Sequence, residues 1–358
     1  RQPKGLDHIH FTTGGSTAID TAVRMVHYYQ ASRGCASKKL IIARDHSYHG
    51  STYAAMSAGK RPGDHVPEFQ YMNDIFHHIS CPNPYRPPEG MEEGDLTELL
   101  VKEFEDTIER LGSNNIGGFL AEPIQASGGV IIPPDSYLRR IREVCKTHNI
   151  LFVADEVVTA FGRLGHWFAS EDEFGMIPDI ICSAKGLSSG YLPIGAMIYS
   201  SEVHEVISQS ESGYFTSGFT YAGHPVSCAA ALKNIEIMER EDILKNAHDV
   251  GLYFENKLST LNDLPLVGNV RGKKMMMCVE NVANKETKEL LPDELNVGKL
   301  ISNKAEELGL LVRPLGHLNV MSPALNITTE DIDFIVLNLK KSIVSVTDSL
   351  VRSGHKIS

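Results

Sequence analysis

Short apolar runs alternate with amphipathic helical segments along the first part of the chain. Four short runs have apolar centres, which is typical of strands buried on both faces of a parallel sheet; they span 38–45, 117–123, 150–157 and 178–184. Between the second and third runs, residues 134–149 place apolar side chains at helical spacing after a Pro-Pro-Asp start. The alternation predicts an α/β fold, with a mostly parallel sheet covered by helices on both faces.

The pattern changes after about residue 235. A long helical stretch is predicted over 224–261, followed by short strands at 267–280, a helix at 296–308, a strand at 309–314 and a closing helix from about Glu330. We therefore predict a large domain over residues 1–235 and a smaller C-terminal α/β domain over residues 236–358. Residues 83–95, rich in Pro, Gly and Glu, predict a long surface loop.

Composition and charge narrow the classes of function. The 358 residues carry a formal net charge of −11 without a basic run, which argues against a nucleic-acid partner. The six cysteines are scattered and form no Cys-x-x-Cys pair, and the histidine pairs His8/His10 and His77/His78 lack further ligands at suitable spacing. These patterns argue against disulfides and a metal site. With no long apolar run and no signal-peptide pattern, we expect a cytoplasmic protein without a membrane span.

Polar side chains end three of the buried strands. Glu122 ends the run GGFLAEP, Asp155 ends ILFVAD, and Lys185 follows PDIICSA. The carboxyl ends of parallel strands meet at one edge of a sheet, where α/β proteins bind their ligands. Because desolvating an ammonium group is costly, a lysine placed there extends its amine to solvent, forms a salt bridge with a neighbouring acid, or is a reactive amine.

Two further segments predict an anion site with an aromatic ring nearby. TTGGSTAID at 12–20 opens a helix, so its backbone N–H groups and the hydroxyls of Ser16 and Thr17 can hold a phosphate, or they form an ordinary N-cap. SYHG at 47–50 places Tyr48 and His49 after another strand, as a stacking surface or as packing residues. A phosphate site, an aromatic ring, an acid and an amine are together what pyridoxal 5′-phosphate (PLP) requires.

These residues lie in motifs that resemble, in order and spacing, those of the fold-type I, class III PLP-dependent aminotransferases, nearest to the ω-amino acid:pyruvate transaminase branch. The resemblance covers essentially the whole chain, and its motifs are residues 14–22, 47–50, 121–134, 151–169, 178–196 and 218–225. It implies a large PLP-binding domain with a smaller C-terminal domain. It also implies a transaminase that moves an amino group from an amine or ω-amino acid to a keto acid such as pyruvate through an internal aldimine.

The resemblance assigns a role to each matching residue. Lys185 matches the family's Schiff-base lysine, which also acts as general acid and base, and Asp155 matches the acid that keeps the pyridine nitrogen protonated. Val157 matches the apolar residue on one face of the cofactor ring. Tyr48 matches the aromatic residue on the other face, with His49 close by.

Four more residues complete the implied cofactor site. Gly15 and Ser16 match the phosphate cradle, and Glu122 matches an active-site acid that steers nearby groups without reacting. Thr220 matches the threonine that reaches the phosphate of the partner subunit, so the resemblance implies a homodimer.

The substrate carboxylate is assigned to Arg313. It matches the arginine that, in the ω-amino acid:pyruvate branch, swings in to bind the keto acid and out to admit an amine. Val320 stands where relatives acting on ornithine- or GABA-type substrates carry a fixed arginine. The alternative is a surface arginine next to a strand.

Other interpretations stay open at this point. Aminomutases and decarboxylating enzymes of the same fold share the lysine and the aspartate, and a catalytically silent binding homologue would share the fold. Family members carry a further segment before the first motif, so part of the substrate pocket is expected to lie outside the sequence given. The amine donor is therefore left open.

Overall fold

The structure is a computed structural model that describes residues 1–91, 95–211 and 213–358. The chain divides into two compact units. The first unit comprises Arg1–Gly128, Ile132–Gly162 and His166–Glu241, and the second comprises Gly129–Ile131, Arg163–Gly165 and Asp242–Ser358. The peptide bond between residues 235 and 236 lies within helix α7 (Pro225–Arg240). The domain boundary placed there from the sequence stays a prediction.

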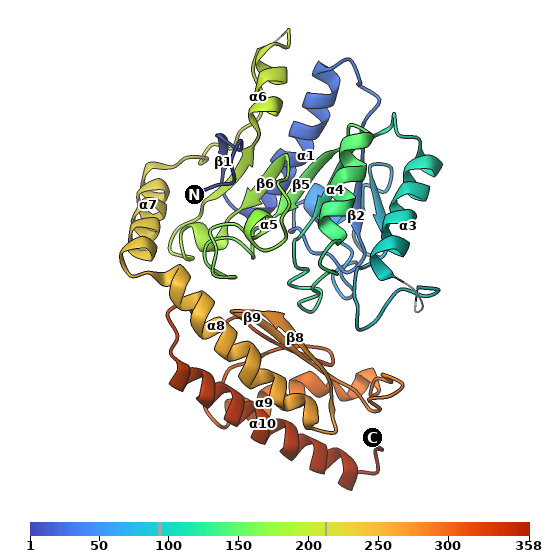
Figure 1. The fold of residues 1–358 in the computed structure, drawn as a ribbon, viewed down its shortest axis with the longest axis vertical. Helices are drawn as coiled ribbons and strands as arrows, with labels where there is room; N and C mark the ends of the chain where they lie inside the picture. Colours follow the sequence, from blue (N-terminus) through green and yellow to red (C-terminus); the bar gives the residue numbers. More distant parts are fainter. Residues whose placement is uncertain (92–94, 212) are drawn as a thin grey trace. The chain divides into compact units, whose positions relative to one another are not determined.

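A seven-stranded sheet forms the centre of the first unit as the structure describes it (Figure 1). Its strand order is β1-β7-β6-β5-β4-β2-β3, and the strands are β1 (His8–Thr12), β2 (Leu40–Arg44), β3 (Phe76–Ile79), β4 (Ile116–Ala121), β5 (Leu151–Asp155), β6 (Ile180–Ser183) and β7 (Gly195–Tyr199). Neighbouring strands from β3 to β6 run parallel, whereas β7 runs antiparallel to both β6 and β1. The prediction of a mostly parallel sheet is confirmed.

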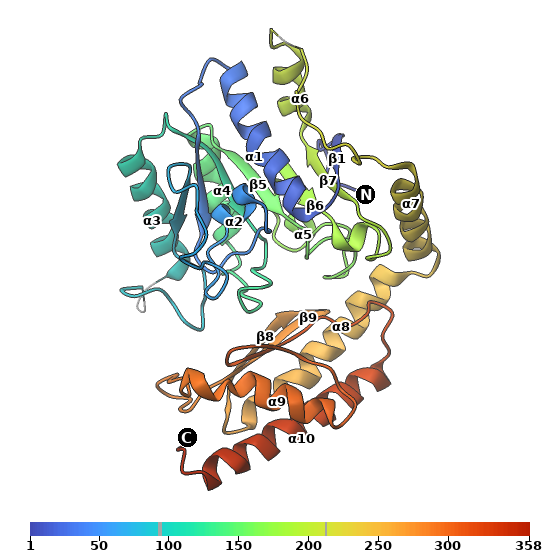
Figure 2. The same cartoon turned by 180° about the vertical axis from the view of Figure 1, so that it is seen from behind.

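Helices cover both faces of this sheet. The described helical elements of the first unit are α1 (Gly15–Ser32), α2 (Tyr53–Ala58), α3 (Leu96–Leu111), α4 (Tyr137–Thr147), α5 (Ala169–Asp172), α6 (Ser201–Ser208), α7 and the 3₁₀ turn η1 (Lys185–Leu187). Figure 1 shows α3 and α4 in front of the sheet, and Figure 2 shows α1 and α2 on the opposite face. Successive side chains of a strand point to opposite faces, so Leu120 packs with the α1 cluster whereas the ring of Phe119 contacts that of Phe104 of α3 in a tilted arrangement.

The second unit has its own sheet and core. Its four strands follow the antiparallel order β10-β11-β9-β8. The elements are α8 (Ile243–Ser259), η2 (Thr260–Asp263), β8 (Val267–Lys273), β9 (Met276–Asn281), η3 (Asp293–Leu295), α9 (Val297–Glu306), β10 (Arg313–Leu315), β11 (Leu318–Met321) and α10 (Thr329–Arg352). A cluster of buried apolar side chains from α8, α9, α10 and the sheet forms the core. A capping box between Thr328 and Asp331 begins α10.

Two predicted elements are corrected. The helical stretch over 224–261 is two helices, because Asp242 adopts a left-handed backbone conformation (φ 52°) between α7 and α8. The strand predicted at 309–314 is partly correct: β10 includes residues 313 and 314, but strand pairing begins only at Arg313. In the predicted loop over 83–95, residues 83–91 and 95 contain no helix or strand, and residues 92–94 lie outside the described residues.

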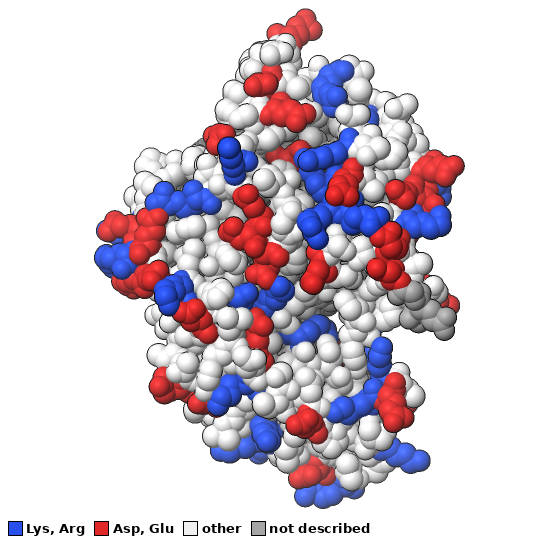
Figure 3. Space-filling model, in the orientation of Figure 1, with Lys and Arg blue, Asp and Glu red and all other residues white. Residues whose placement is uncertain are grey.

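The structure also addresses membrane spans, metal sites, cysteines and surface charge. No described helix combines the length and the apolar character needed to cross a lipid bilayer. No three His, Cys, Asp or Glu side chains of the described residues group as ligands for a metal ion. All six cysteines are free thiols. Acidic and basic side chains are interspersed in small groups over the face shown in Figure 3.

Candidate active site

The parallel strands of the first unit bring the predicted acids and the lysine to one edge of the sheet. Ala121 pairs with Ala154 between β4 and β5, and Asp155 pairs with Cys182 between β5 and β6. Glu122 and Asp155 therefore end neighbouring strands at nearly the same level, and Lys185 follows β6 by two residues. This edge, the carboxyl edge, is the place where ligands bind in α/β sheets.

Lys185 presents its side chain to solvent in a strained backbone conformation. The residue is exposed, its φ is 31°, and its amine has no ion-pair or hydrogen-bond partner among the described residues. The salt-bridge alternative is therefore wrong. A left-handed φ is costly for a residue with a Cβ atom and is found mainly at functional sites. The surrounding backbone is fixed by Asn234 of α7, whose side-chain amide donates to the carbonyl oxygens of Gly186 (2.9 Å) and Leu187 (3.2 Å).

Asp155 is a buried acid whose orientation is fixed by two hydrogen bonds. Only 4% of the residue is exposed. Nδ1 of His49 lies 2.7 Å from its Oδ2 atom, and the backbone N–H of Val157 donates to its Oδ1 atom at 3.1 Å. Nε2 of His49 is buried and has no hydrogen-bond partner in the part of the chain that the structure describes. His49 is therefore a neighbour of the acid rather than of the bulk solvent.

Glu122 links the carboxyl edge to the segment that carries Tyr48. One carboxylate oxygen accepts the backbone N–H of Tyr48 at 3.0 Å, and the other accepts that of Ala126 at 2.9 Å. Burial raises the pKa of Glu122, and the electrostatic interaction with His49 opposes this effect. Both oxygens hold backbone groups, which fits the expected steering role of this acid.

The start of α1 forms an anion site. Gly14 precedes the helix without a side-chain cap, so the N–H groups of the first turn lack acceptors within the helix. The hydroxyl of Ser16 accepts the N–H of Ser51 at 3.1 Å, and the hydroxyl of Thr17 donates to the carbonyl oxygen of Gly14 at 2.9 Å. The alternative of an ordinary Ser/Thr N-cap is therefore wrong. Free N–H groups at a helix N-terminus favour phosphate.

Two glycines allow close contacts around this anion site. A Cβ atom on Gly15 would lie 3.0 Å from Cγ1 of Val157, so α1 begins directly against the residue predicted to cover the cofactor ring. A Cβ atom on Gly50 would lie 2.4 Å from Oγ of Ser16, and Gly50 has a φ of 137°. Only glycine fits there without displacing Ser16. The sequence analysis missed this role of Gly50, although the residue belongs to the quoted SYHG motif.

Thr220 and Arg313 are two exposed residues that do not belong to the carboxyl edge. Thr220 is exposed between α6 and α7, and its side chain makes no hydrogen bond to the described residues. Arg313 is exposed in the second unit, where it begins β10 and pairs directly with Val320 of β11.

The residues at the carboxyl edge fit PLP on structural grounds. The uncapped start of α1 suits its phosphate, and buried Asp155 suits a protonated ring nitrogen, because a carboxylate stabilises a cation strongly in a low-dielectric site. The exposed amine of Lys185 has no competing partner among the described residues. Val157 and Tyr48 supply apolar and aromatic surface.

Comparisons with known proteins agree with this geometry. The sequence profile of the family described as "Aminotransferase class-III" matches residues 1–343. The putrescine–pyruvate aminotransferase of Pseudomonas aeruginosa is 39% identical over 343 residues, covering 95% of this chain and 74% of that protein. The mitochondrial gamma aminobutyrate transaminase 1 of Solanum lycopersicum is 40% identical over 336 residues, covering 93% of this chain and 65% of that protein.

Solved structures show the same relationship. A thermostable (S)-enantioselective omega-transaminase from Thermomicrobium roseum superimposes with a TM-score of 0.91 at 38% identity, over 96% of this chain and 76% of that one. An amine transaminase from an uncultivated Pseudomonas species, solved with PLP bound, gives a TM-score of 0.90 at 35% identity, over 95% and 77% of the two chains. This chain therefore belongs to the class-III aminotransferases, fold-type I enzymes that use pyridoxal phosphate to transfer an amino group.

Proposed function

We propose that this enzyme transfers the amino group of a primary amine or ω-amino acid to a keto acid such as pyruvate, with Lys185 as its catalytic amine. The observation that carries the proposal is the exposed amine of Lys185, which has no partner among the described residues although it follows a buried strand beside Asp155. The relatives named for putrescine and for gamma aminobutyrate support the donor class, since both compounds carry an amino group on a terminal carbon. Mutases, decarboxylases and silent homologues are not favoured, because these relatives are transaminases.

The protein's own residues perform distinct tasks in this reaction. When bound, PLP supplies an electrophilic carbon for the amine and a ring that accepts electrons. Nζ of Lys185 would take the proton that leaves the substrate carbon and return it at C4′ of the cofactor, as a general base and then a general acid. The carboxylate of Asp155 holds a proton at the ring nitrogen. The hydrogen bonds from His49 and Val157 keep that carboxylate in place.

The remaining residues of the carboxyl edge bind and orient. The first turn of α1, with Gly15 and Ser16, binds the phosphate through backbone N–H groups. Tyr48 and Val157 orient the ring, and Glu122 holds the backbone of Tyr48. None of these groups takes part in bond making, so each contributes through positioning.

For the substrate carboxylate we propose Arg313. Its pairing with Val320 leaves an apolar residue directly opposite the arginine in the β10–β11 hairpin, so that strand position offers no second fixed cation. The planar guanidinium binds a carboxylate through two parallel hydrogen bonds, and its long stem permits two positions.

We also propose that the active unit is a homodimer. Thr220 lies in a stretch where large apolar side chains are exposed: Tyr214 (64%), Tyr221 (71%), Val226 (59%) and Leu232 (69%). Surface apolar residues gathered in this way mark interaction sites. Sedimentation velocity at assay concentration tests the proposal, and a fully active monomer would contradict it. A cytoplasmic location also stays a prediction.

The test of the proposed function is a screen of amine donors with pyruvate. The purified holoenzyme is mixed with putrescine, gamma aminobutyrate, β-alanine or 1-phenylethylamine, while alanine formation and the visible absorbance of the cofactor are followed. We expect alanine with at least one donor and a reversible absorbance change. A protein whose cofactor spectrum responds to no donor and to no keto acid would contradict the proposal.

A further inference from the structure

Tyr48 lies in a segment that has no regular secondary structure. It sits between β2 and α2, and residues 47–50 belong to neither a helix nor a strand. Its backbone N–H is held by Glu122, and its hydroxyl lies 3.2 Å from the hydroxyl of Ser51. These contacts fix the two ends of the residue. They do not prevent the ring from rotating about its long axis. That rotation is restricted only by side chains packed against the two faces of the ring.

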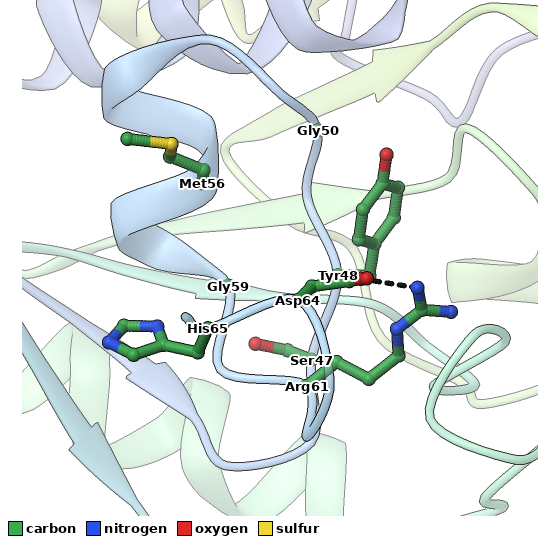
Figure 4. Close-up of a pocket in the computed structure, with 8 residues that line it drawn as sticks. All are labelled: Ser47, Tyr48, Gly50, Met56, Gly59, Arg61, Asp64 and His65. Atoms are coloured by element: carbon green, nitrogen blue, oxygen red, sulfur yellow. Dashed lines mark ion pairs between the residues drawn. The ribbon is translucent and has the colours of Figure 1, made fainter. Parts of the chain in front are cut away.

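One ring face is covered by Arg61. The guanidinium carbon of Arg61 lies 5.2 Å from the centre of the Tyr48 ring, within the range of a cation–π contact. Figure 4 shows the two side chains near each other among the residues that line a small pocket. That pocket is lined by Ser47, Tyr48, Gly50, Met56, Gly59, Arg61, Asp64 and His65.

Arg61 is itself immobilised. It forms an ion pair with Asp64, marked by the dashed line in Figure 4, and its Nη1 donates to the carbonyl oxygen of Ser127 at 3.4 Å. The side chain of Arg61 is only 16% exposed, whereas that of Asp64 is 40% exposed. Ordering such a long side chain costs conformational entropy. An ion pair with a partly exposed acid contributes little free energy to offset that cost. The contact with Tyr48 is the remaining interaction of its charged group.

We propose that Arg61 is a positioning residue that clamps the Tyr48 ring, so that the opposite ring face is presented to the cofactor. The inference rests on the proposed role of Tyr48 in orienting PLP. The inference assigns Arg61, from the segment that follows α2, to the proposed PLP site. Arginine suits this task because its planar fork stacks on an aromatic ring while Nη1 donates to Ser127 and Nη2 pairs with Asp64.

The test compares Arg61→Gln with Arg61→Lys and with a control, Arg140→Gln. Arg140 also pairs with an acid, Glu98, on the surface of the first unit, but it stacks on no aromatic ring. In Arg61→Gln we expect faster amide hydrogen exchange over residues 46–52 without added cofactor, and an affinity for PLP weakened about threefold to thirtyfold. Arg61→Lys keeps the cation without the planar fork, and we expect it to recover part of the affinity. Arg140→Gln is expected to match the wild type.

A double-mutant cycle decides whether Arg61 acts through Tyr48. In a Tyr48→Leu background, Arg61→Gln should weaken PLP binding no further, because the clamped ring is gone. An equal loss in both backgrounds, or Arg61→Gln behaving like Arg140→Gln, overturns the inference. If Arg61→Gln does not fold, Asp64→Asn is measured in its place. It releases the guanidinium from its acid, and a smaller change in exchange over 46–52 is expected, with no change overturning the inference.

Failure of the proposed function is distinguishable from failure of this inference. Hydrogen exchange and PLP affinity require no turnover, so they report on Arg61 even if the wild-type enzyme transfers no amino group to pyruvate. That last result would contradict the proposed function alone.

Discussion

The imidazole of His49 lies 2.7 Å from the carboxylate of Asp155, and both residues are almost completely buried. A buried carboxylate that loses a hydrogen-bond donor retains the cost of its desolvation. The pair therefore joins the stability of the first unit to the chemistry at its carboxyl edge.

We expect His49→Phe to lower the free energy of unfolding by about 1–3 kcal/mol relative to His49→Asn, whose amide nitrogen can replace Nδ1 as the donor. The affinity for PLP should fall in the same order. Urea denaturation and titration of the apoprotein with PLP measure the two effects. Equal stability of the two variants would show that the hydrogen bond to Asp155 contributes little.

Lys185→Ala should lower the rate of transamination by more than about a thousandfold, because correct positioning of the substrate does not replace a covalent catalyst. The variant should still bind PLP through the phosphate and ring contacts. In the wild type, borohydride reduction followed by peptide mass mapping should place the cofactor on Lys185. The control is Lys146→Ala on the surface of α4, with wild-type activity expected; labelling of another lysine would reject the assignment.

Gly50→Ala should weaken binding of PLP by about tenfold or more, because the new Cβ atom would lie 2.4 Å from Oγ and 2.9 Å from Cα of Ser16. Gly63→Ala is the matched control. Gly63 also has a positive φ (87°), but an added Cβ atom meets nothing within 4 Å. The difference between the variants isolates the clash from backbone strain, and similar affinities in both would argue against the contact with Ser16.

Arg313→Ala should separate the two half-reactions. Conversion of the aminated enzyme by pyruvate should lose about 2–5 kcal/mol of transition-state stabilisation, as expected when one partner of a buried charge pair is removed. The half-reaction with an amine that lacks a carboxylate should change much less. Stopped-flow absorbance measures both, with Arg352→Ala at the end of α10 as the control. Equal losses in the two half-reactions, or none in either, would mean that Arg313 is not the receptor.

His78 should make the first unit less stable in mild acid. Burial lowers the pKa of His78 to about 4, and its Nε2 lies 3.0 Å from the carbonyl oxygen of Ala58. In the unfolded chain the imidazole titrates near pH 6.5. The stability that its neutral form contributes is therefore fully present above that pH and is lost as the pH falls towards 4.

The measurement for His78 is the free energy of unfolding in urea at two pH values. Between about pH 7.5 and about pH 5.5, the wild type should lose about 1 kcal/mol more than His78→Gln, which can still donate to Ala58 but does not titrate. His355→Gln, near the C-terminus, serves as the control. A wild type and a His78→Gln variant with the same pH dependence would show that His78 is not the source.

The carboxyl edge could be predicted from the sequence because two local signals coincide there. Apolar runs identify strands buried on both faces, and the polar residue that ends each run marks the edge, as Glu122 and Asp155 do. Parallel pairing then brings them together without further information. The roles carried over by resemblance, such as those of Thr220 and Arg313, depend on a partner subunit or on a moving side chain and stay predictions.

Features created by tertiary contacts could not be predicted. The contacts of Gly50 with Ser16 and of Arg61 with Tyr48 join segments that have no common periodicity. Residues 309–312 illustrate a different limit: Leu310 and Val312 are buried and Leu311 is 81% exposed, as in a strand. Pairing with a neighbouring strand is a property of the whole sheet and leaves no local signal.

The left-handed backbone conformation of Lys185 determines which amino acids are most stable at this position. At a φ of 31°, glycine avoids the steric cost that every side chain with a Cβ atom pays. A Lys185→Gly variant should therefore be more resistant to denaturation than the wild type, by about 1 kcal/mol, although it is inactive. Directed evolution for thermal resistance alone would then favour glycine at this position, whereas selection for turnover would keep the lysine if it has the proposed catalytic role.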